Sequence, residues 1–411
     1  MSEFRLTTVE EFEAATARLL ETGAKVGADS WQARVKNQTP HCKFGEEGVC
    51  CRICTMGPCR ITKKAPRGIC GCDVHGIVGR NYLKFTAGGA ATHSDHGREI
   101  CHTLYATAAD GCYKVKDPDK LIRIAKEWGI ETEGKDIYDL AHEVAYEGLM
   151  EYGKPFGTQR FLKRAPESQQ KLWEENELAP RAIDREVSCS LHMAHMGCSS
   201  KPEALVKQSI RAGLSDGWGG SMMGTEFSDV LFGTPKPIET EANLGVMVEE
   251  NVNIVVHGHD PSLSEMICEV ADSPEMVAYA KEMGAKGITI SGVCCTSNEV
   301  AMRRGIPMAG NFLQQENVVL TGACEAIVVD VQCIFPALGP LSKCFHTKFI
   351  TTSPIAQMPD SEFIRFDAHS ALEKATLIVK LAIENSKNRK PELVYIPQMK
   401  QKATVGYSTE A

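Results

Sequence analysis

Asn253-Ile254-Val255-Val256 is the first of a series of short β-branched runs that decide the fold of this 411-residue chain. Helical segments separate the runs from one another. From about Leu244 onward, the predicted strands are Asn253–Val256, Gly287–Ile290, Ala326–Val331 and Phe349–Thr352. Strands that alternate with helices predict a parallel, doubly wound, Rossmann-like sheet covered on both faces. A helix from Ala368 to about Lys387 closes this unit.

The chain before residue 240 is helical in character. Thr8-x-x-Glu11 resembles a capping box, and the amphipathic run that follows it stops around Gly23. Further helices are predicted at 117–128, 136–152 and 202–214. We therefore expect an α + α/β protein, with a helical domain over residues 1–240 and a Rossmann-like domain over residues 241–395.

Composition excludes several classes of partner. The net charge of −8 provides no basic surface for nucleic acid or for an anionic membrane. The amino terminus lacks the basic region and apolar core of a signal peptide, and no stretch reaches the roughly 18 apolar residues of a membrane span. We expect a cytoplasmic protein, in which thiols stay reduced and clustered cysteines indicate metal ligands or redox chemistry.

Seven of the 17 cysteines lie between His41 and Asp73. Within this run, four cysteines have the spacing of a 4Fe-4S site, three close together and one on the return of the loop: Cys51, Cys54, Cys59 and Cys70. Zinc is the main alternative. Structural zinc sites usually pair two Cys-x2-Cys knuckles, and only one such spacing is present here, so the pattern favours iron–sulfur.

Cys42 and Cys50 remain from the same run. Two thiolates cannot complete a four-iron cluster, but a two-fold axis would bring the same pair from a second subunit. The sequence therefore predicts a homodimer with a shared cluster. Cys72 is predicted to be a plain thiol.

A second metal site is predicted at the ends of the strands. His259 follows the first strand, Cys295 the second, and Cys333 the strand through Val331. Ligands in open α/β sheets bind outside the carboxyl ends of the strands, where these loops converge. Imidazole and thiolates suit iron, nickel or zinc. The alternative for each residue alone is an ordinary buried cysteine or a capping histidine.

Several motifs, in order along the whole chain, resemble those of the nickel-iron carbon monoxide dehydrogenases of anaerobes. These motifs are Cys42-Lys-Phe-Gly-Glu-Glu-Gly-Val-Cys50-Cys51-Arg-Ile-Cys54-Thr-Met-Gly-Pro-Cys59, His93-Ser-Asp-His96-Gly-Arg, Phe227-Ser-Asp-Val-Leu-Phe-Gly-Thr-Pro, His257-Gly-His259, Gly292-Val-Cys294-Cys295-Thr-Ser-Asn-Glu-Val and Asp330-Val-Gln-Cys333. The resemblance implies the hybrid-cluster/CO dehydrogenase-like fold.

The resemblance also implies roles for the ligand candidates. Cys42 and Cys50 would hold half of the shared 4Fe-4S cluster, and the four-cysteine set would hold an internal one. His259, Cys295 and Cys333 would bind irons of the nickel-iron-sulfur cluster. That family oxidises carbon monoxide with water to carbon dioxide, two protons and two electrons, and it passes the electrons through the 4Fe-4S clusters to ferredoxin or a similar acceptor. An acetyl-CoA synthase subunit is a further partner that the resemblance leaves open.

For protons, the resemblance points to His93 as a catalytic residue, with His96 and His102 behind it. The spacing suggests that one helix could stack these residues near one face. Where the family often has another histidine, this chain has Glu99, which could also relay protons. Asp216 corresponds to a family aspartate near the active cluster.

Two further patterns are expected not to bind metal. Cys189, His192, His195 and Cys198 are spaced three apart, and on one helix they would spiral around the axis instead of enclosing an ion. Cys294 is expected to point away from Cys295 if the segment is extended. His257 shares a face with His259, and the resemblance favours the latter as a ligand.

This chain differs from the family at its end. Those enzymes continue into another Rossmann-like domain that supplies further cysteines and a lysine, and residues 396–411 resemble its opening. We expect activity to need that portion, as a separate chain or a read-through product. The alternatives are a non-catalytic iron–sulfur electron-transfer or structural subunit and, with less support, a relative of the hydroxylamine reductases, which lack the Cys42 and Cys50 arrangement.

Overall fold

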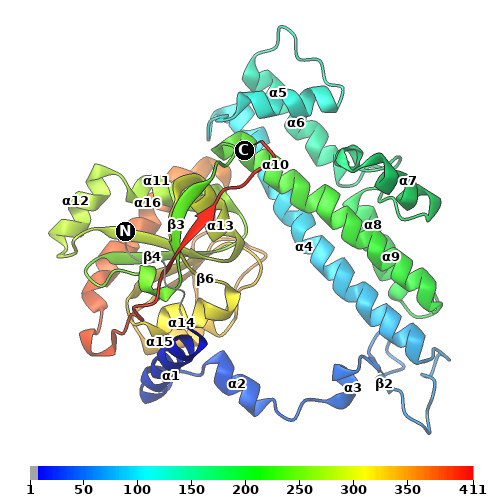
Figure 1. Cartoon of the computed structure of the whole chain (residues 1–411), viewed down its shortest axis with the longest axis horizontal. Coiled ribbons are helices and arrows are strands. Elements are labelled where there is room, and N and C mark those ends of the chain that lie inside the picture. The colour runs from blue at the N-terminus through cyan, green and yellow to red at the C-terminus, as the bar shows by residue number, and fades with distance from the viewer. Residues whose placement is uncertain (1–7, 411) are drawn as a thin grey trace. The chain divides into compact units, whose positions relative to one another are not determined.

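The computed structural model describes residues 8–410 and divides the chain into two compact units. One unit contains the chain up to Asn37, the segment Asp110–Asp117 and the chain from Leu231 onward. The other contains Gln38–Ala109 and Pro118–Val230. Figure 1 shows the first as a sheet with helices around it and the second as a set of long helices.

The first unit is built on an eight-stranded sheet with the order β10-β3-β6-β5-β4-β7-β8-β9. Neighbouring strands are parallel except for the antiparallel pair of β10 and β3. The strands are β3 (Ile238–Ala242), β4 (Val252–Gly258), β5 (Ile288–Val293), β6 (Met308–Gly310), β7 (Cys324–Val329), β8 (Lys348–Thr351), β9 (Glu362–Phe363) and β10 (Gln401–Val405). The predicted parallel sheet and its four predicted strands are confirmed, with ends that differ by a few residues.

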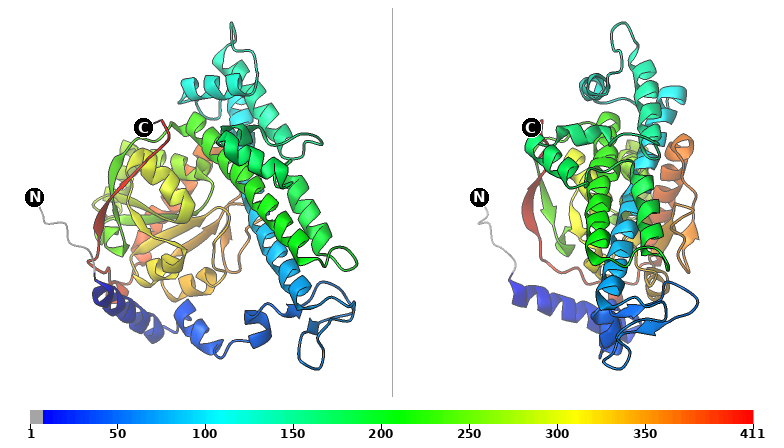
Figure 2. Two further views of the ribbon diagram at one scale, coloured as in Figure 1. Left: turned by 45° about the vertical axis from the view of Figure 1, so that its right-hand side comes forward. Right: turned by 90° about the vertical axis from the view of Figure 1, so that its right-hand side faces the viewer.

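Helices cover both faces of this sheet (Figure 2). They are α11 (Pro261–Ala271), α12 (Pro274–Glu282), α13 (Cys294–Arg304), α14 (Gln315–Leu320), α15 (Leu338–Cys344) and α16 (Ala371–Asn385). Every residue of β4 and β7 is buried. Successive side chains of a strand point to opposite faces, so Val255 joins one hydrophobic cluster while Ile254 and Val256 join the other. Burial on both faces explains why these strands are almost continuously apolar.

The two ends of the chain pack against this sheet unit. The capping box of Thr8 and Glu11 is confirmed at the start of α1 (Val9–Lys25), and Leu19 of this helix joins one of the two clusters. A short helix, α2 (Trp31–Asn37), follows. β10 pairs with β3 and forms one edge of the sheet. The sheet unit thus includes α1 and β10. From the sequence, we expected α1 in the helical domain and β10 in the opening of another domain.

The second unit is helical apart from a small antiparallel pair, β1 (Cys50–Cys51) and β2 (Cys59–Arg60). Its helices are α3 (Lys43–Glu46), α4 (Val74–Asp110), α5 (Pro118–Glu127), α6 (Ile137–Glu151), α7 (Glu167–Glu175), α8 (Ile183–Ala194), α9 (Pro202–Ser215) and α10 (Met222–Phe232). The predicted helices at 117–128, 136–152 and 202–214 are confirmed to within two residues. Between α9 and α10, Asp216–Ser221 forms a π-helical turn.

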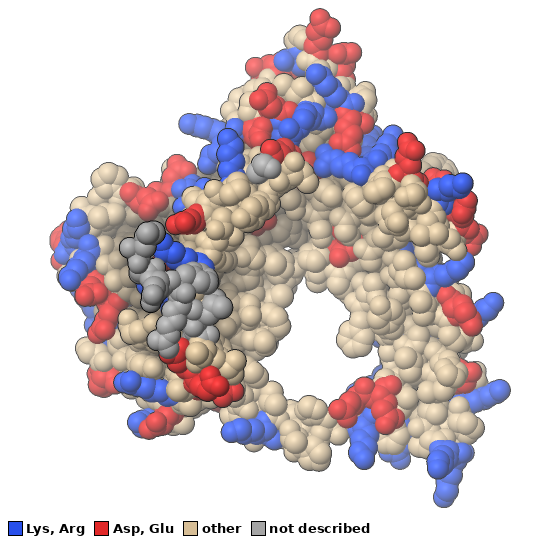
Figure 3. Space-filling model, in the orientation of Figure 1, with Lys and Arg blue, Asp and Glu red and all other residues tan. Residues whose placement is uncertain are grey.

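The long helix α4 organises this unit, with α8 and α9 beside it (Figures 1 and 2). Leu83 of α4 forms a buried cluster with Ala194 and Leu205. No helix in residues 8–410 is long and apolar enough to cross a membrane. Lys and Arg are interspersed with Asp and Glu on the face shown in Figure 3.

Candidate metal sites and their proton-transfer residues

The amino-terminal cysteine loop is held to the start of α4. Asn81 Nδ2 donates hydrogen bonds to the carbonyl oxygens of Gly48 at 2.9 Å and Cys50 at 3.0 Å. β1 and β2 pair so that Cys51 lies opposite Cys59. This pairing brings the early and middle cysteines of the loop together at the end of the helix.

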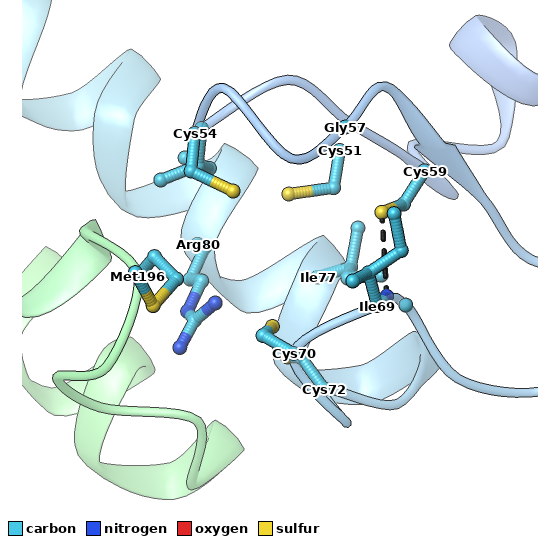
Figure 4. A pocket seen from close by; sticks show the side chains of 12 residues that line it. Cys51, Cys54, Gly57, Cys59, Ile69, Cys70, Cys72, Ile77, Arg80 and Met196 are labelled. Carbon is cyan, nitrogen blue, oxygen red and sulfur yellow. Dashed lines mark hydrogen bonds between the residues drawn. The ribbon is translucent and has the colours of Figure 1, made fainter.

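The loop borders a small hollow that is partly open to solvent. All four cysteines predicted for the internal cluster line it, and Figure 4 shows their side chains around a common space. The other lining residues are Ile53, Gly57, Gly68, Ile69, Cys72, Ile77, Arg80 and Met196. The structure thus brings together Cys51, Cys54, Cys59 and Cys70 as the spacing predicted.

Hydrogen-bond donors lie beside two of the sulfur atoms of this hollow, those of Cys59 and Cys70. The backbone N–H of Ile69 donates to Cys59 Sγ at 3.4 Å. The pKa of the Cys70 thiol is lowered by the backbone N–H of Cys72 and, to a smaller extent, by the Arg80 guanidinium. Both contacts favour the thiolate, the form that binds iron.

The donor set therefore fits a 4Fe-4S cluster. Such a cluster takes four thiolates, each on a different iron atom, and the loop supplies four around one space. A single metal ion instead needs several ligands within reach of one point. Residues 8–410 contain no group of three Cys, His, Asp or Glu side chains arranged in that way.

Cys50 lies next to Cys51 in β1 but is not among the residues that line the hollow. Adjacent strand residues point to opposite sides, which separates the two thiols. Cys42 is exposed and precedes α3. The shared cluster of these two residues stays a prediction.

Cys72 is buried, with 5% of its surface exposed, and burial raises the pKa of its thiol. Its sulfur lies so close to Gly76 that a Cβ atom there would be 2.6 Å from it. Its role as a plain thiol is also untested, but its position at the hollow was not expected from sequence.

The strand-end site is organised by a buried carboxylate. Asp330 follows β7, and its Oδ1 accepts hydrogen bonds from the backbone N–H groups of His259 and Asp260, the latter at 3.1 Å. His259 Nδ1 lies 3.2 Å from the carbonyl oxygen of Val331. A histidine that donates Nδ1–H to a carbonyl holds the tautomer in which Nε2 can bind a metal.

Cys295, the second residue of α13, lies near Cys333, in the loop after β7. Burial is the largest influence that raises the pKa of Cys295, and the nearby Cys333 raises it further. One imidazole and two thiols from three neighbouring parallel strands thus approach one edge of the sheet, a donor set that fits a nickel-iron-sulfur group in part.

The expectation for Cys294 applied to an extended segment, and this segment is helical. Cys294 begins α13 with a φ of 67°, and its thiol lies near that of Cys333. Cys333 also has a left-handed backbone, with a φ of 59°. His257 is fully buried in β4, and its Nε2 lies 3.1 Å from Gln315 Oε1.

The helical unit brings together His93 and Asp216, the two residues predicted to be catalytic. His93 Nδ1 of α4 lies 2.8 Å from Oδ1 of Asp216, the first residue of the π-helical turn. This hydrogen bond raises the pKa of His93. The turn lies directly against α4, because a Cβ atom at Gly220 would be 2.7 Å from the His93 carbonyl carbon.

The expectation that the relay histidines share one face of a helix is wrong. α4 is continuous from Val74 to Asp110, and residues nine apart on an α-helix stand about two and a half turns apart, on opposite sides. His93 and His102 therefore face different directions. His96 and Glu99 fall between them in steps of three residues, so any relay would wind around the helix.

Comparisons with known proteins show the family of this chain. Residues 49–407 match the model of the Prismane/CO dehydrogenase family. The chain belongs to this family. It is 46% identical over 407 residues to carbon monoxide dehydrogenase 1 of Methanosarcina mazei, which covers 98% of this chain and 65% of that protein.

Solved structures of family members have the same fold. The nickel-free crystal structure of carbon monoxide dehydrogenase from Thermococcus sp. AM4 matches 96% of this chain and 63% of its own, with a TM-score of 0.94 and 48% identity. A structure of acetyl-CoA synthase/carbon monoxide dehydrogenase matches 97% of this chain and 60% of its own, with a TM-score of 0.92 and 40% identity. The chain thus spans slightly under two thirds of the length of these relatives.

The segment from Cys189 to Cys198 differs from the expected single helix. α8 ends at Ala194, so His195 and Cys198 lie in the following loop. The loop nevertheless touches the cysteine hollow through Met196. Sequence reasoning missed Met196 and Arg80 at this hollow, and nothing in their local pattern singles them out.

Proposed function

We propose that this chain provides the electron-transfer site and part of the active site of an enzyme that oxidises carbon monoxide with water to carbon dioxide, two protons and two electrons. The observation that carries the proposal is the approach of His259, Cys295 and Cys333 to one sheet edge, in a chain whose relatives are named carbon monoxide dehydrogenases. This chain spans only 65% of the length of the relative from Methanosarcina mazei. We therefore propose the activity for a protein that also contains the remaining portion, and not for this chain alone.

At the strand ends, the chain would hold a nickel-iron-sulfur group. When bound, that group supplies metal ions that lower the pKa of water and polarise carbon monoxide. Asp330 fixes the loop that carries His259, through hydrogen bonds from two backbone N–H groups. Cys295 and Cys333 are both exposed, so their sulfur atoms are open to an incoming metal group.

His93 would receive protons released by the reaction. The carboxylate of Asp216 stabilises the imidazolium form, so His93 can hold a proton at a pH where an ordinary histidine is mostly neutral. His96, Glu99 and His102 would pass protons onward along α4. Glu99 and His102 are exposed, so protons could reach solvent from them.

Electrons would leave through the cysteine loop. Cys51, Cys54, Cys59 and Cys70 would hold the internal cluster, and Cys42 and Cys50 would share a second cluster with another copy of the chain. The neighbouring surface supports a homodimer, since α4 exposes Val78, Tyr82 and Phe85 with helical spacing. Ferredoxin or a similar protein would accept the electrons.

A link to acetyl-CoA synthesis is a further part of the proposal. The chain is 41% identical to the carbon monoxide dehydrogenase/acetyl-CoA synthase subunit beta of Moorella thermoacetica. An acetyl-CoA synthase subunit is therefore a candidate partner.

The test uses the native protein, purified without oxygen and with whatever chain accompanies it. Metal content, the spectra of the iron–sulfur clusters, and reduction of a viologen dye by carbon monoxide are measured together. Iron, nickel and carbon monoxide-dependent dye reduction would support the proposal. Iron without nickel, with clusters that dithionite reduces and carbon monoxide does not, would instead support a non-catalytic electron-transfer or structural subunit.

A further inference from the structure

Arg80 is a buried cation at the cysteine hollow. Only 3% of its surface is exposed, and it lines the hollow together with the four predicted cluster ligands. Its Nε donates a hydrogen bond to the carbonyl oxygen of Ser199 at 2.7 Å, which fixes the guanidinium to the loop after α8. Figure 4 shows the side chain beside Met196 at one side of the hollow, and it contacts the Cys70 sulfur.

No carboxylate forms an ion pair with Arg80 within residues 8–410. The nearby Asp73 uses its Oδ1 to accept a hydrogen bond from the Gly76 backbone N–H at 2.9 Å. A cation removed from water without an opposite charge is strongly unfavourable. The position of Arg80 is therefore explained if the hollow holds an anionic group.

We propose that Arg80 is a positioning residue of the internal iron–sulfur site, which compensates the negative charge of the cluster and raises its reduction potential. This inference rests on the proposed cluster of Cys51, Cys54, Cys59 and Cys70. The cluster with four thiolates is anionic, and one further electron makes it more so. A fixed positive charge next to one ligand sulfur stabilises the reduced form more than the oxidised form.

Arginine suits this place better than lysine because its guanidinium is more weakly hydrated than an ammonium group and loses less when it is removed from water. Its planar group also donates in several directions at once, and here it binds Ser199 on one side and reaches Cys70 on the other. The step it influences is a one-electron reduction, and no bond forms or breaks at Arg80.

The test is a potentiometric titration of the native protein, with the reduced cluster monitored by electron paramagnetic resonance, in Arg80→Gln and Arg80→Lys. We expect Arg80→Gln to keep its iron and to lower the ratio of reduced to oxidised cluster about tenfold at a fixed potential, because a charge close to the cluster is removed. Arg80→Lys should retain most of the wild-type ratio. Arg52→Gln is the matched control, since it removes an exposed charge from the same loop and water screens that charge.

The outcomes separate this inference from the cluster assignment. An iron-loaded Arg80→Gln with the wild-type potential overturns the role of Arg80. A wild-type protein without a cluster at this loop overturns the proposed site itself. If Arg80→Gln loses its iron, recovery of the cluster in Arg80→Lys supports the charge role, and failure of both variants to assemble overturns it in favour of a purely geometric one.

Discussion

His93 Nδ1 and Asp216 Oδ1 lie 2.8 Å apart, although 123 residues separate them in the sequence. The contact joins the middle of α4 to the π-helical turn before α10. π-Helical turns are rare and are often found at functional sites. Here the turn places a carboxylate on the histidine that the sequence identified as a candidate for proton transfer.

Asp216→Asn is expected to lower the pKa of His93 toward its ordinary value, because the hydrogen bond to the carboxylate is the largest cause of its elevation. A raised pKa in the folded state means that the pair stabilises the fold fully below the pKa of the unfolded chain. That stabilisation is lost as the pH rises through the raised value. The stability difference between wild type and Asp216→Asn should therefore shrink as the pH rises.

An NMR titration of histidine-labelled, metal-free protein measures this shift directly. His102 is an internal control, since its pKa is lowered by partial desolvation of the ring and then by Arg98, and Asp216→Asn changes neither. An unchanged His93 titration in Asp216→Asn would contradict the pairing.

Gly220→Ala tests the close approach of the turn to α4. The added Cβ would lie 2.7 Å from the His93 carbonyl carbon, so the turn must move. We expect a loss of about 1–3 kcal/mol in the free energy of unfolding, typical of overpacking. Urea denaturation followed by circular dichroism gives this value, and the pKa of His93 should fall in the same variant.

Gly213→Ala is the matched control in the neighbouring helix α9. A Cβ atom there meets nothing within 4 Å. Alanine at an exposed helix position should be neutral or stabilise the protein by up to about 1 kcal/mol. Equal destabilisation by both substitutions would show that the tight contact at Gly220 is not the cause.

Cys295→Ala tests the division into two metal sites. We expect this variant to lose nickel and the active cluster but to keep the iron–sulfur spectrum of the cysteine loop, because Cys295 belongs to the sheet unit and the loop to the helical unit. Metal analysis and low-temperature electron paramagnetic resonance of anaerobically purified protein are the measurements. Cys54→Ala is the reciprocal variant, and equal loss of both signals in either one would refute the partition.

Phe85→Glu tests the proposed homodimer. Phe85 is 82% exposed on α4, and a charge there would oppose burial of this face against a second copy. Sedimentation velocity should show a shift from dimer to monomer at low micromolar concentration. Phe156→Glu is the control, since Phe156 is 86% exposed in a loop and does not belong to the α4 stripe. Dissociation by both variants, or by neither, would count against α4 as the interface.

The sequence predicted those parts of the fold whose signal is local. β-Branched runs with helices between them indicated the parallel sheet, and Thr8 with Glu11 indicated the start of α1. The strands at the edges of the sheet were harder to predict. Pairing of β10 with β3 depends on strands more than 150 residues apart, and no local pattern carries that information.

The candidate site shows the same limit. Spacing alone grouped the four loop cysteines, because they lie close in sequence and one loop can gather them. The sequence left the direction of Cys294 open, because it depends on where β5 ends and α13 begins, and a left-handed residue at that point brings the thiol near Cys333. The relay residues were predicted to share one face because residues three apart on a helix lie near the same side. Over nine residues, from His93 to His102, the deviation adds up to half a turn.

By itself, the sequence determined which residues could serve as ligands and which strands would carry them, since ligand chemistry and strand periodicity are properties of neighbouring residues. Only the tertiary structure decided which groups meet. The contact of His93 with Asp216 and the burial of Arg80 beside Cys70 arise from packing between distant segments, where steric fit and the cost of an unpaired buried charge select the partners.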